Sequence, residues 1–171
     1  MRRILVVITF IACFASIGHA QSNIAKEWAY ESIILKLSSD NAFLNMAAES
    51  VAEGIESLLV SELATHGVES GKTTISFTED GKFTAKVGEK IGKGTYSTSD
   101  SILSFSIGKL SSVATTSKKD GDYLSIYLKN EQVTNFISMI GDSEKYSAIT
   151  YITPALETFD DMEIGVKLKL K

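Results

Sequence analysis

Residues 74–87 read TISFTEDGKFTAKV, and this stretch decides the fold class. Apolar residues alternate with polar ones at a period of two on both sides of Asp80-Gly81. An Asp-Gly pair between two alternating runs is a strong short-range signal for a β-hairpin, because glycine readily adopts the left-handed backbone that a tight turn requires. The stretch therefore predicts two antiparallel strands joined by a short turn.

Further short strands are predicted on the C-terminal side of this hairpin, at 91–96, 102–107, 110–115 and 123–128. Strands that follow one another this closely must pair antiparallel, because a parallel crossover needs about a dozen residues or more. Residues 162–170 also alternate, which predicts a final strand with one buried and one solvated face. The pattern favours an antiparallel sheet that curls into a barrel.

Helical periodicity marks the flanks of this sheet. Residues 28–37 are typical of a first strand, either regular or with an irregular start, and residues 38–41 then offer several helix N-cap side chains. Apolar residues recur at helical spacing from Phe43 to Leu63, so a long amphipathic helix is predicted to end near Gly67. Two C-terminal helices are predicted at 130–140 and 143–156, the second kinked or restarted by Pro154. The predicted class is mainly β (α+β): a barrel or curled sheet with these helices packed on it or in it.

The first twenty residues have the layout of a secretory signal peptide. Arg2 and Arg3 precede an apolar stretch that is followed by Gly18-His19-Ala20, with small residues three and one before the expected cut after Ala20. The apolar stretch is shorter than the roughly 20 residues that a membrane helix needs. We expect Sec export of a single domain, residues 21–171, to the periplasm, the cell envelope or the medium, with no transmembrane segment after cleavage.

Cys13 is the only cysteine, and its alternative interpretation is a lipoprotein acceptor. The apolar run continues past Cys13, where a lipoprotein would become polar, and Phe10 fits that motif poorly. The interpretation of Cys13 as a signal-peptide hydrophobe is therefore favoured over lipidation.

Composition excludes several function classes for the expected mature chain. Without Arg2 and Arg3, 15 basic residues remain, all lysine, against 21 acidic ones, so the net charge is −6. An acidic surface without arginine disfavours nucleic acid, nucleotides and anionic membranes. One histidine, His66, and no cysteine exclude zinc sites of the Cys/His kind and Cys-His nucleophiles. We expect no enzyme activity, no cofactor, no metal site and no catalytic residue.

Three sets of residues resemble functional motifs, but their sequence context favours a structural role for each. Residues 67–73 resemble a phosphate-binding loop, but the spacing is one residue short and a helix precedes the loop, so we predict a structural turn. Acidic residues at 120–122 and 160–163 could hold calcium or supply an acid and a base, but they lack the ligand spacing of a calcium loop and fall in predicted turns. His66 is predicted to be a solvated residue at the end of the long helix.

Five stretches, in this order and spacing, resemble a lipocalin-like domain family of unknown function that occurs in exported proteins of Bacteroidetes. They are Trp28-Ala29-Tyr30, Ser39-Asp40-Asn41, residues 75–84, Gly94-Thr95-Tyr96 and residues 156–165. The resemblance covers nearly the whole expected mature chain. It implies a lipocalin-like antiparallel barrel without catalytic residues to carry over.

Four aromatic residues are the candidates for a ligand-facing set: Trp28, Tyr96, Tyr123 and Tyr127. Tyr123 and Tyr127 share one face of a strand whose other face is also apolar, so packing beneath a helix is the alternative to a binding wall. The leading hypothesis is an exported, non-enzymatic binding module for a small apolar ligand. The alternative is a structural or adaptor protein of the cell envelope, with a helix-filled barrel that contacts another envelope protein.

Overall fold

The fold is seen in a computed structural model, which describes residues 15–16, 24–99, 101–106, 113–129, 132–133, 153–155 and 157–171. These residues form nine strands and one long helix. The elements are β1 (Ala15–Ser16), β2 (Glu27–Ser38), α2 (Ala42–Thr65), β3 (Thr74–Phe77), β4 (Lys82–Val87), β5 (Lys90–Ser99), β6 (Ile102–Ser106), β7 (Val113–Asp120), β8 (Tyr123–Lys129) and β9 (Asp161–Leu170).

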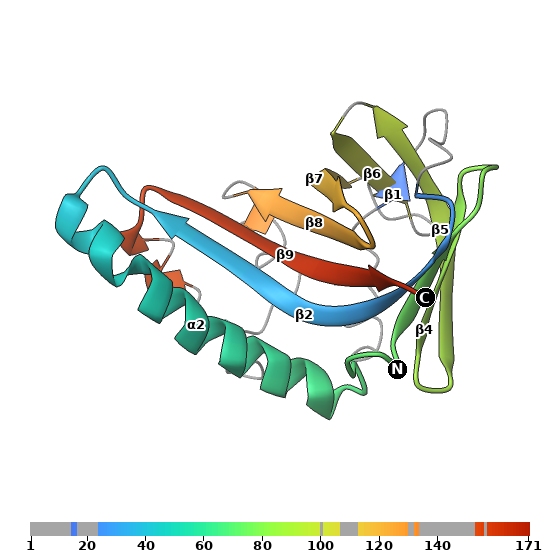
Figure 1. The fold of residues 1–171 in the computed structure, drawn as a ribbon, viewed down its shortest axis with the longest axis horizontal. Helices are drawn as coiled ribbons and strands as arrows, with labels where there is room; N and C mark the ends of the chain where they lie inside the picture. The colour runs from blue at the N-terminus through green and yellow to red at the C-terminus, as the bar shows by residue number, and fades with distance from the viewer. Residues whose placement is uncertain are drawn as a thin grey trace.

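All of the strand pairings are antiparallel, and the sheet closes on itself. Strands β2 to β6 pair in sequence, β2 also pairs with β9, and the series β9, β8, β7 returns to β6. This makes a closed ring of eight strands, β2 to β9 (Figure 1). The short β1 pairs with β6 and lies within the expected signal peptide, and the ring closes without it. The predicted antiparallel, mainly β class is confirmed.

A β-bulge divides β2 into two parts. The register against β9 shifts between Tyr30 and Ser32, which leaves Glu31 as the extra residue. Before the bulge Trp28 and Tyr30 are buried, and after it Ile33 and Leu35 are buried, so the buried face changes from even to odd positions. Pairing of β2 with β3 covers only residues 27–29. Beyond the bulge β2 therefore continues with β9 on one side and no strand of the described chain on the other.

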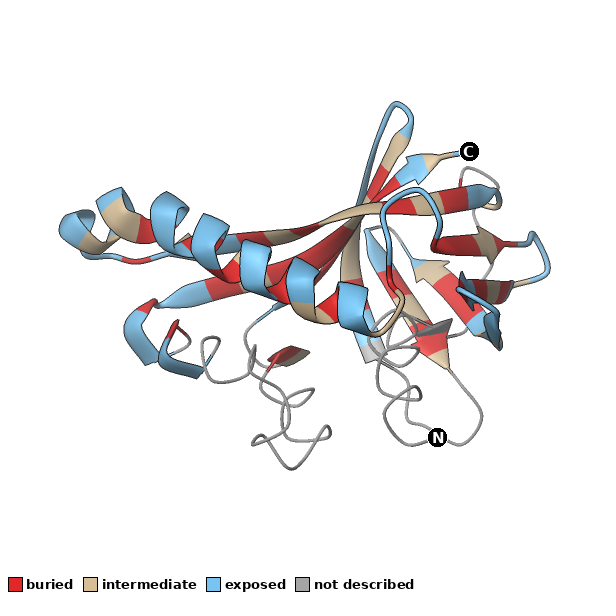
Figure 2. Cartoon of the chain, turned by 90° about the horizontal axis from the view of Figure 1, so that it is seen from below, coloured by how far each residue is buried: buried red, intermediate tan, exposed pale blue. Residues whose placement is uncertain are grey.

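The predicted long helix is confirmed, and it lies alongside the free side of β2 (Figure 1). Its N-cap is Asn41, whose side-chain oxygen accepts hydrogen bonds from the backbone N–H groups of Phe43 and Leu44. The helix presents one narrow buried stripe to the sheet and an exposed face to solvent (Figure 2). The buried stripe consists of Ala48, Ala52, Ile55, Leu59 and Leu63.

The two predicted C-terminal helices are not found as such, and this part of the fold prediction is corrected. Within 130–140 the described residues are 132–133, and within 143–156 they are 153–155; both pieces are helical, as are residues 157–158. The rest of these predicted helices lies outside the described residues. In the described part of the chain α2 is the only substantial helix, and no helix there is long and apolar enough to cross a membrane.

A single hydrophobic cluster joins the ring to α2 and includes the inward-facing residues of the strands. Its most aromatic part lies on β3 to β6. There the rings of Phe77, Phe83, Tyr96 and Phe105 contact one another, with centroid distances from 4.8 to 6.3 Å. We call these four residues the aromatic end of the ring.

Candidate functional site

Two of the four candidate ligand-facing residues, Trp28 and Tyr96, are fully buried in the core. The indole N–H of Trp28 donates to the carbonyl of Ile24 at 2.9 Å. The hydroxyl of Tyr96 donates to the carbonyl of Thr78 at 2.7 Å. Both polar atoms are therefore satisfied by backbone of the same chain, as buried polar groups require.

The other two candidates, Tyr123 and Tyr127, lie on the opposite face of β8 from Leu124, Ile126 and Leu128. The ammonium of Lys36 lies 4.0 Å from the centroid of the Tyr127 ring, and that of Lys167 lies 4.3 Å from the Tyr123 ring. Lysines thus contact both rings on the face of β8 that points away from Leu124, Ile126 and Leu128, where Tyr127 is buried and Tyr123 is half-buried. The structure places the four aromatic residues on two different faces and does not gather them into one wall.

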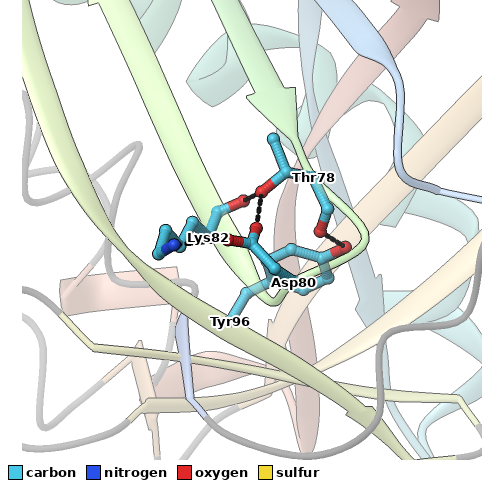
Figure 3. Close-up of polar contacts among 4 residues, drawn as sticks. All are labelled: Thr78, Asp80, Lys82 and Tyr96. Carbon is cyan, nitrogen blue, oxygen red and sulfur yellow. Dashed lines mark hydrogen bonds and ion pairs between the residues drawn. The ribbon is translucent and has the colours of Figure 1, made fainter.

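The contact of Tyr96 with Thr78 is part of a hydrogen-bonded turn between β3 and β4 (Figure 3). The hydroxyl of Thr78 lies 2.5 Å from a carboxylate oxygen of Asp80 and 2.8 Å from the carbonyl oxygen of Lys82. Asp80 also pairs with the Lys82 ammonium, and these contacts lower the pKa of Asp80, the Lys82 hydrogen bond most and the Thr78 hydrogen bond next. These interactions fix the turn, where Gly81 has a φ of 75°.

The remaining motifs occupy structural positions. Residues 67–73 form the turn between α2 and β3, where Lys72 pairs with Glu69 at 2.5 Å. Asp160, the residue before β9, accepts hydrogen bonds from the Ser39 hydroxyl and the Asp40 backbone N–H, and these two contacts, in that order, lower its pKa. Among the described residues, no group of three or more His, Cys, Asp or Glu side chains could hold a metal ion.

A groove of about 510 Å³ opens between α2 and β2, and we take it as the candidate site. Apolar atoms of Leu35, Leu37, Ala48 and Ala52 line it together with five polar side chains, which are Lys36, Asn45, Glu49, Glu53 and Glu56. Its volume lies in the range of roughly 300–1,000 Å³ that is typical of ligand sites. The groove exists because β2 leaves β3 at the bulge and α2 covers the open side with small residues.

The groove is acidic. Glu49 and Glu53 are exposed, and neither carboxylate pairs with a cation among the described residues. The positive charge in the lining is already compensated, since the Lys36 ammonium contacts Glu163 at 2.9 Å. Burial lowers the pKa of Lys36, but the Glu163 hydrogen bond and neighbouring charges outweigh it, so the net direction is upward and Lys36 stays charged.

One backbone group of β2 faces this groove directly. The N–H of Leu35 donates to a carboxylate oxygen of Glu56 at 2.5 Å, across the gap between strand and helix. In the N-terminal part of α2, the apolar side chains of Phe43 and Met46 are exposed, at 77% and 84%. Sequence reasoning did not find this site, because glutamates along a helix look like an ordinary solvated face and the free edge of β2 depends on where its pairing with β3 ends.

An antiparallel ring of eight strands with a helix beside it defines a lipocalin-like domain, and comparison with known proteins agrees. The chain matches the family described as Lipocalin-like domain (DUF4923) over residues 7–170, and it therefore belongs to that family. The family resemblance predicted from the sequence is confirmed.

Other comparisons add little. A crystal structure of a DUF4847 family protein from Bacteroides vulgatus ATCC 8482 is similar at 15% sequence identity, covering 60% of this chain and 84% of that one. The TM-score is 0.35, which is too low to support a functional comparison. No curated protein sequence matches this chain.

Proposed function

We propose that this domain is an exported, non-enzymatic binding module that acts as an adaptor for another polypeptide of the cell envelope. The observation that carries the proposal is the groove between α2 and β2, about 510 Å³ in volume. It is lined by β2, by apolar side chains and by two carboxylates, Glu49 and Glu53, that have no cationic partner among the described residues. Such a mixture of apolar and polar groups suits recognition of a polypeptide better than of a purely apolar ligand.

The positions of the aromatic residues support an outer recognition surface. Trp28 and Tyr96 already satisfy their polar atoms within the chain, and Tyr123 and Tyr127 lie on the outside under lysines. The packed aromatic end serves stability in this proposal, and the α2–β2 side serves binding.

A carrier of a small apolar ligand is the second candidate, and one observation favours it. The hydroxyl of Tyr30 is buried and has no hydrogen-bond partner among the described residues. A buried hydroxyl of this kind is a group that a bound ligand can complete.

Export is part of the proposal. Cleavage after Ala20 removes β1 and leaves the ring of β2 to β9 intact, since β6 and β7 pair directly. The mature protein then starts at Gln21 and resides in the periplasm, at the envelope or in the medium.

Photo-crosslinking in the producing cell tests the adaptor. A photoreactive amino acid replaces Glu53, in the groove, and in a matched variant Lys118, an exposed residue of β7. We expect the Glu53 variant to give a discrete protein adduct that the Lys118 variant does not give.

Native mass spectrometry of the same material provides the second arm. We expect a chain that begins at Gln21 and carries no small added mass. A lipid-sized mass on the chain, together with equal or absent crosslinking at the two positions, would overturn the adaptor in favour of the carrier.

A further inference from the structure

We infer that the groove takes an extended, basic polypeptide segment of another protein, which pairs with the outer edge of β2 over residues 33–37 as an added strand. This inference rests on the proposed function and deepens it by naming the chemistry of the partner. Its support comes from the backbone, the shape and the charge of the groove.

The backbone of β2 has an edge here that no strand of the described residues pairs with. One side of residues 32–38 pairs with β9, while pairing with β3 ends at Ala29. The Leu35 N–H points to the other side, because it donates to Glu56. Since successive residues of a strand direct their N–H and C=O groups to opposite sides, Ile33 and Leu37 present theirs in the same direction as Leu35. An unpaired edge of this kind is a template for strand addition.

The groove has the size and lining for one extended segment. The residues that α2 turns toward the groove floor, Ala48 and Ala52, are small, which keeps space beside the strand edge. A strand of five residues is roughly 17 Å long, so a segment that lies in the groove beside Leu35 to Leu37 extends past the groove lining to Ile33. One row of its alternating side chains faces the apolar floor, and the other faces the glutamates.

The charges select a basic partner. Glu49, Glu53 and Glu56 are spaced so that they follow one side of α2, and all three line the groove. Glu49 and Glu53 have no cationic partner among the described residues, while Lys36 is held by Glu163. A strand with lysine or arginine at alternate positions supplies the missing positive charges, and apolar residues between them contact Leu35 and Leu37.

Glu56 has a distinct place in this arrangement. Its carboxylate occupies the Leu35 N–H in the free protein and so keeps the edge from pairing with unrelated chains. A carbonyl oxygen of the incoming strand replaces that carboxylate. The displaced Glu56 then faces a basic side chain of the partner.

Defined peptides test the inference by fluorescence anisotropy with the mature protein. The probe is an acetylated, amidated peptide of about nine residues in which valine and lysine alternate, long enough to span the edge. Matched probes carry glutamate in place of lysine, or N-methyl groups on alternate backbone amides. We expect the basic peptide to bind and the acidic and N-methylated peptides not to bind. Equal binding of the acidic or N-methylated peptide, or no binding of the basic one, would overturn the inference.

Charge variants locate the contact. Glu49→Gln/Glu53→Gln removes two exposed carboxylates, and Glu89→Gln in the β4–β5 turn is the control. Exposed ion pairs each contribute little to binding, so we expect the double variant to weaken binding by roughly tenfold and the control to leave it unchanged. An equal effect of both variants would show that the peptide senses only net charge, which would also overturn the inference.

Amide hydrogen exchange gives a readout with a built-in control along β2. Ile33 and Leu37 should gain protection in the complex, while Ile34 and Lys36, whose N–H groups face β9, should not change. Gains at all four positions, or at none, would contradict strand addition. If these tests fail while crosslinking at Glu53 still captures a protein, the adaptor function stands and only the mode of binding is wrong.

Discussion

The aromatic end of the ring and the α2–β2 side belong to one hydrophobic cluster but are built in opposite ways. At the aromatic end large rings pack against one another, and β4, β5 and β6 each have strand neighbours on both sides. On the α2–β2 side small alanines, exposed glutamates and a free strand edge surround a groove. The packed strands β3 to β6 stabilise the fold. Because they do so, the part of β2 beyond the bulge can lack a second neighbouring strand without loss of the fold.

Removal of one aromatic side chain from each region should give the largest difference in the free energy of unfolding. Phe83 is 1% exposed and its ring lies 5.5 Å from that of Phe105, whereas Phe43 is 77% exposed. We expect Phe83→Ala to lower the free energy of unfolding by about 4 kcal/mol, because it leaves a cavity in a packed core. We expect Phe43→Ala to change it by less than about 0.5 kcal/mol.

Urea denaturation followed by circular dichroism measures both free energies. Similar losses for the two variants would contradict the division into a packed and an open region. If the Phe43→Ala variant lost crosslinking at Glu53 while its stability was unchanged, the binding surface of the open region would extend to Phe43.

Addition of one methyl group to each region should change the stability of the protein by almost as different an amount. A Cβ at Gly94 would overlap the carbonyl oxygen of Ser106 and lie 2.5 Å from Cε1 of Phe83, while a Cβ at Gly54 in α2 meets nothing within 4 Å. We expect Gly94→Ala to destabilise the protein by about 3 kcal/mol through overpacking.

The matched change in the helix should have the opposite sign. Gly54→Ala should stabilise the protein by about 1 kcal/mol, because alanine is the better residue in an exposed helix. Thermal unfolding ranks both variants against the parent protein. A tolerated Gly94→Ala would mean that the aromatic end can relax and is not the rigid part of the ring.

Two buried tyrosines allow the contribution of a single hydroxyl group to stability to be compared. The Tyr96 hydroxyl donates to Thr78, whereas the Tyr30 hydroxyl has no partner among the described residues. Tyr96→Phe should cost about 1 kcal/mol, since it removes one of two donors to that carbonyl and leaves the Gly81 N–H, at 3.1 Å, as the other. Tyr30→Phe should be neutral or stabilising. A loss from Tyr30→Phe as large as that from Tyr96→Phe would favour the carrier, because it would indicate a bonded partner for that hydroxyl.

The same tyrosines set the alkaline limit of stability. Burial raises the pKa of Tyr30 to about 12, and burial, Asp80 and Glu79 together raise the pKa of Tyr96 to about 12. The unfolded chain loses these protons near the ordinary value of 10.0, so the stability they support is full below pH 10 and falls as the pH rises toward 12. Denaturation midpoints between pH 9 and 12 measure this fall, which each Phe variant should reduce.

Local sequence patterns predicted the elements whose cause is local. Asp80-Gly81 lies in the turn between β3 and β4, and Asn41 caps α2, as the turn and cap preferences indicated. Of the strand expected at 110–115, residues 110–112 lie outside the described residues, and residues 113–115 belong to β7, which continues to Asp120. Its inward-facing Thr115 is polar and donates its hydroxyl to the Leu103 carbonyl at 2.5 Å. A core position filled by threonine does not show in an alternation of apolar residues.

The groove could not be predicted in this way, because its causes are not local. The bulge at Glu31 changes which residues of β2 face the core, and the run Ile33-Ile34-Leu35 fits either choice. The free edge depends on pairing between β2 and β3, whose partners are far apart in the chain; Trp28 and Ile75, for example, are 47 residues apart. The aromatic candidates were chosen by residue type, which does not tell the inner from the outer face of a strand.

Low pH should destabilise the two regions through different carboxylates. These effects on stability should be the smallest of those predicted. The pKa of Asp160 is lowered by hydrogen bonds from Ser39 and Asp40, between β2 and α2, and that of Asp80 is lowered mainly by Lys82 at the aromatic end. Each contact therefore stabilises the fold above the ordinary value of 3.8 and is lost as the pH falls through the lower value in the folded protein.

Substitution with asparagine should remove this dependence region by region. Below pH 4, the protection of residues 39–41, measured as amide exchange relative to the intrinsic rate at each pH, should fall in the parent protein. Asp160→Asn should make that protection independent of pH while leaving the protection of residues 78–82 sensitive. Asp80→Asn should do the reverse. If either variant removed the pH dependence of amide protection in both segments, the two regions would open as one unit. The groove could then not change conformation without disturbing the aromatic end.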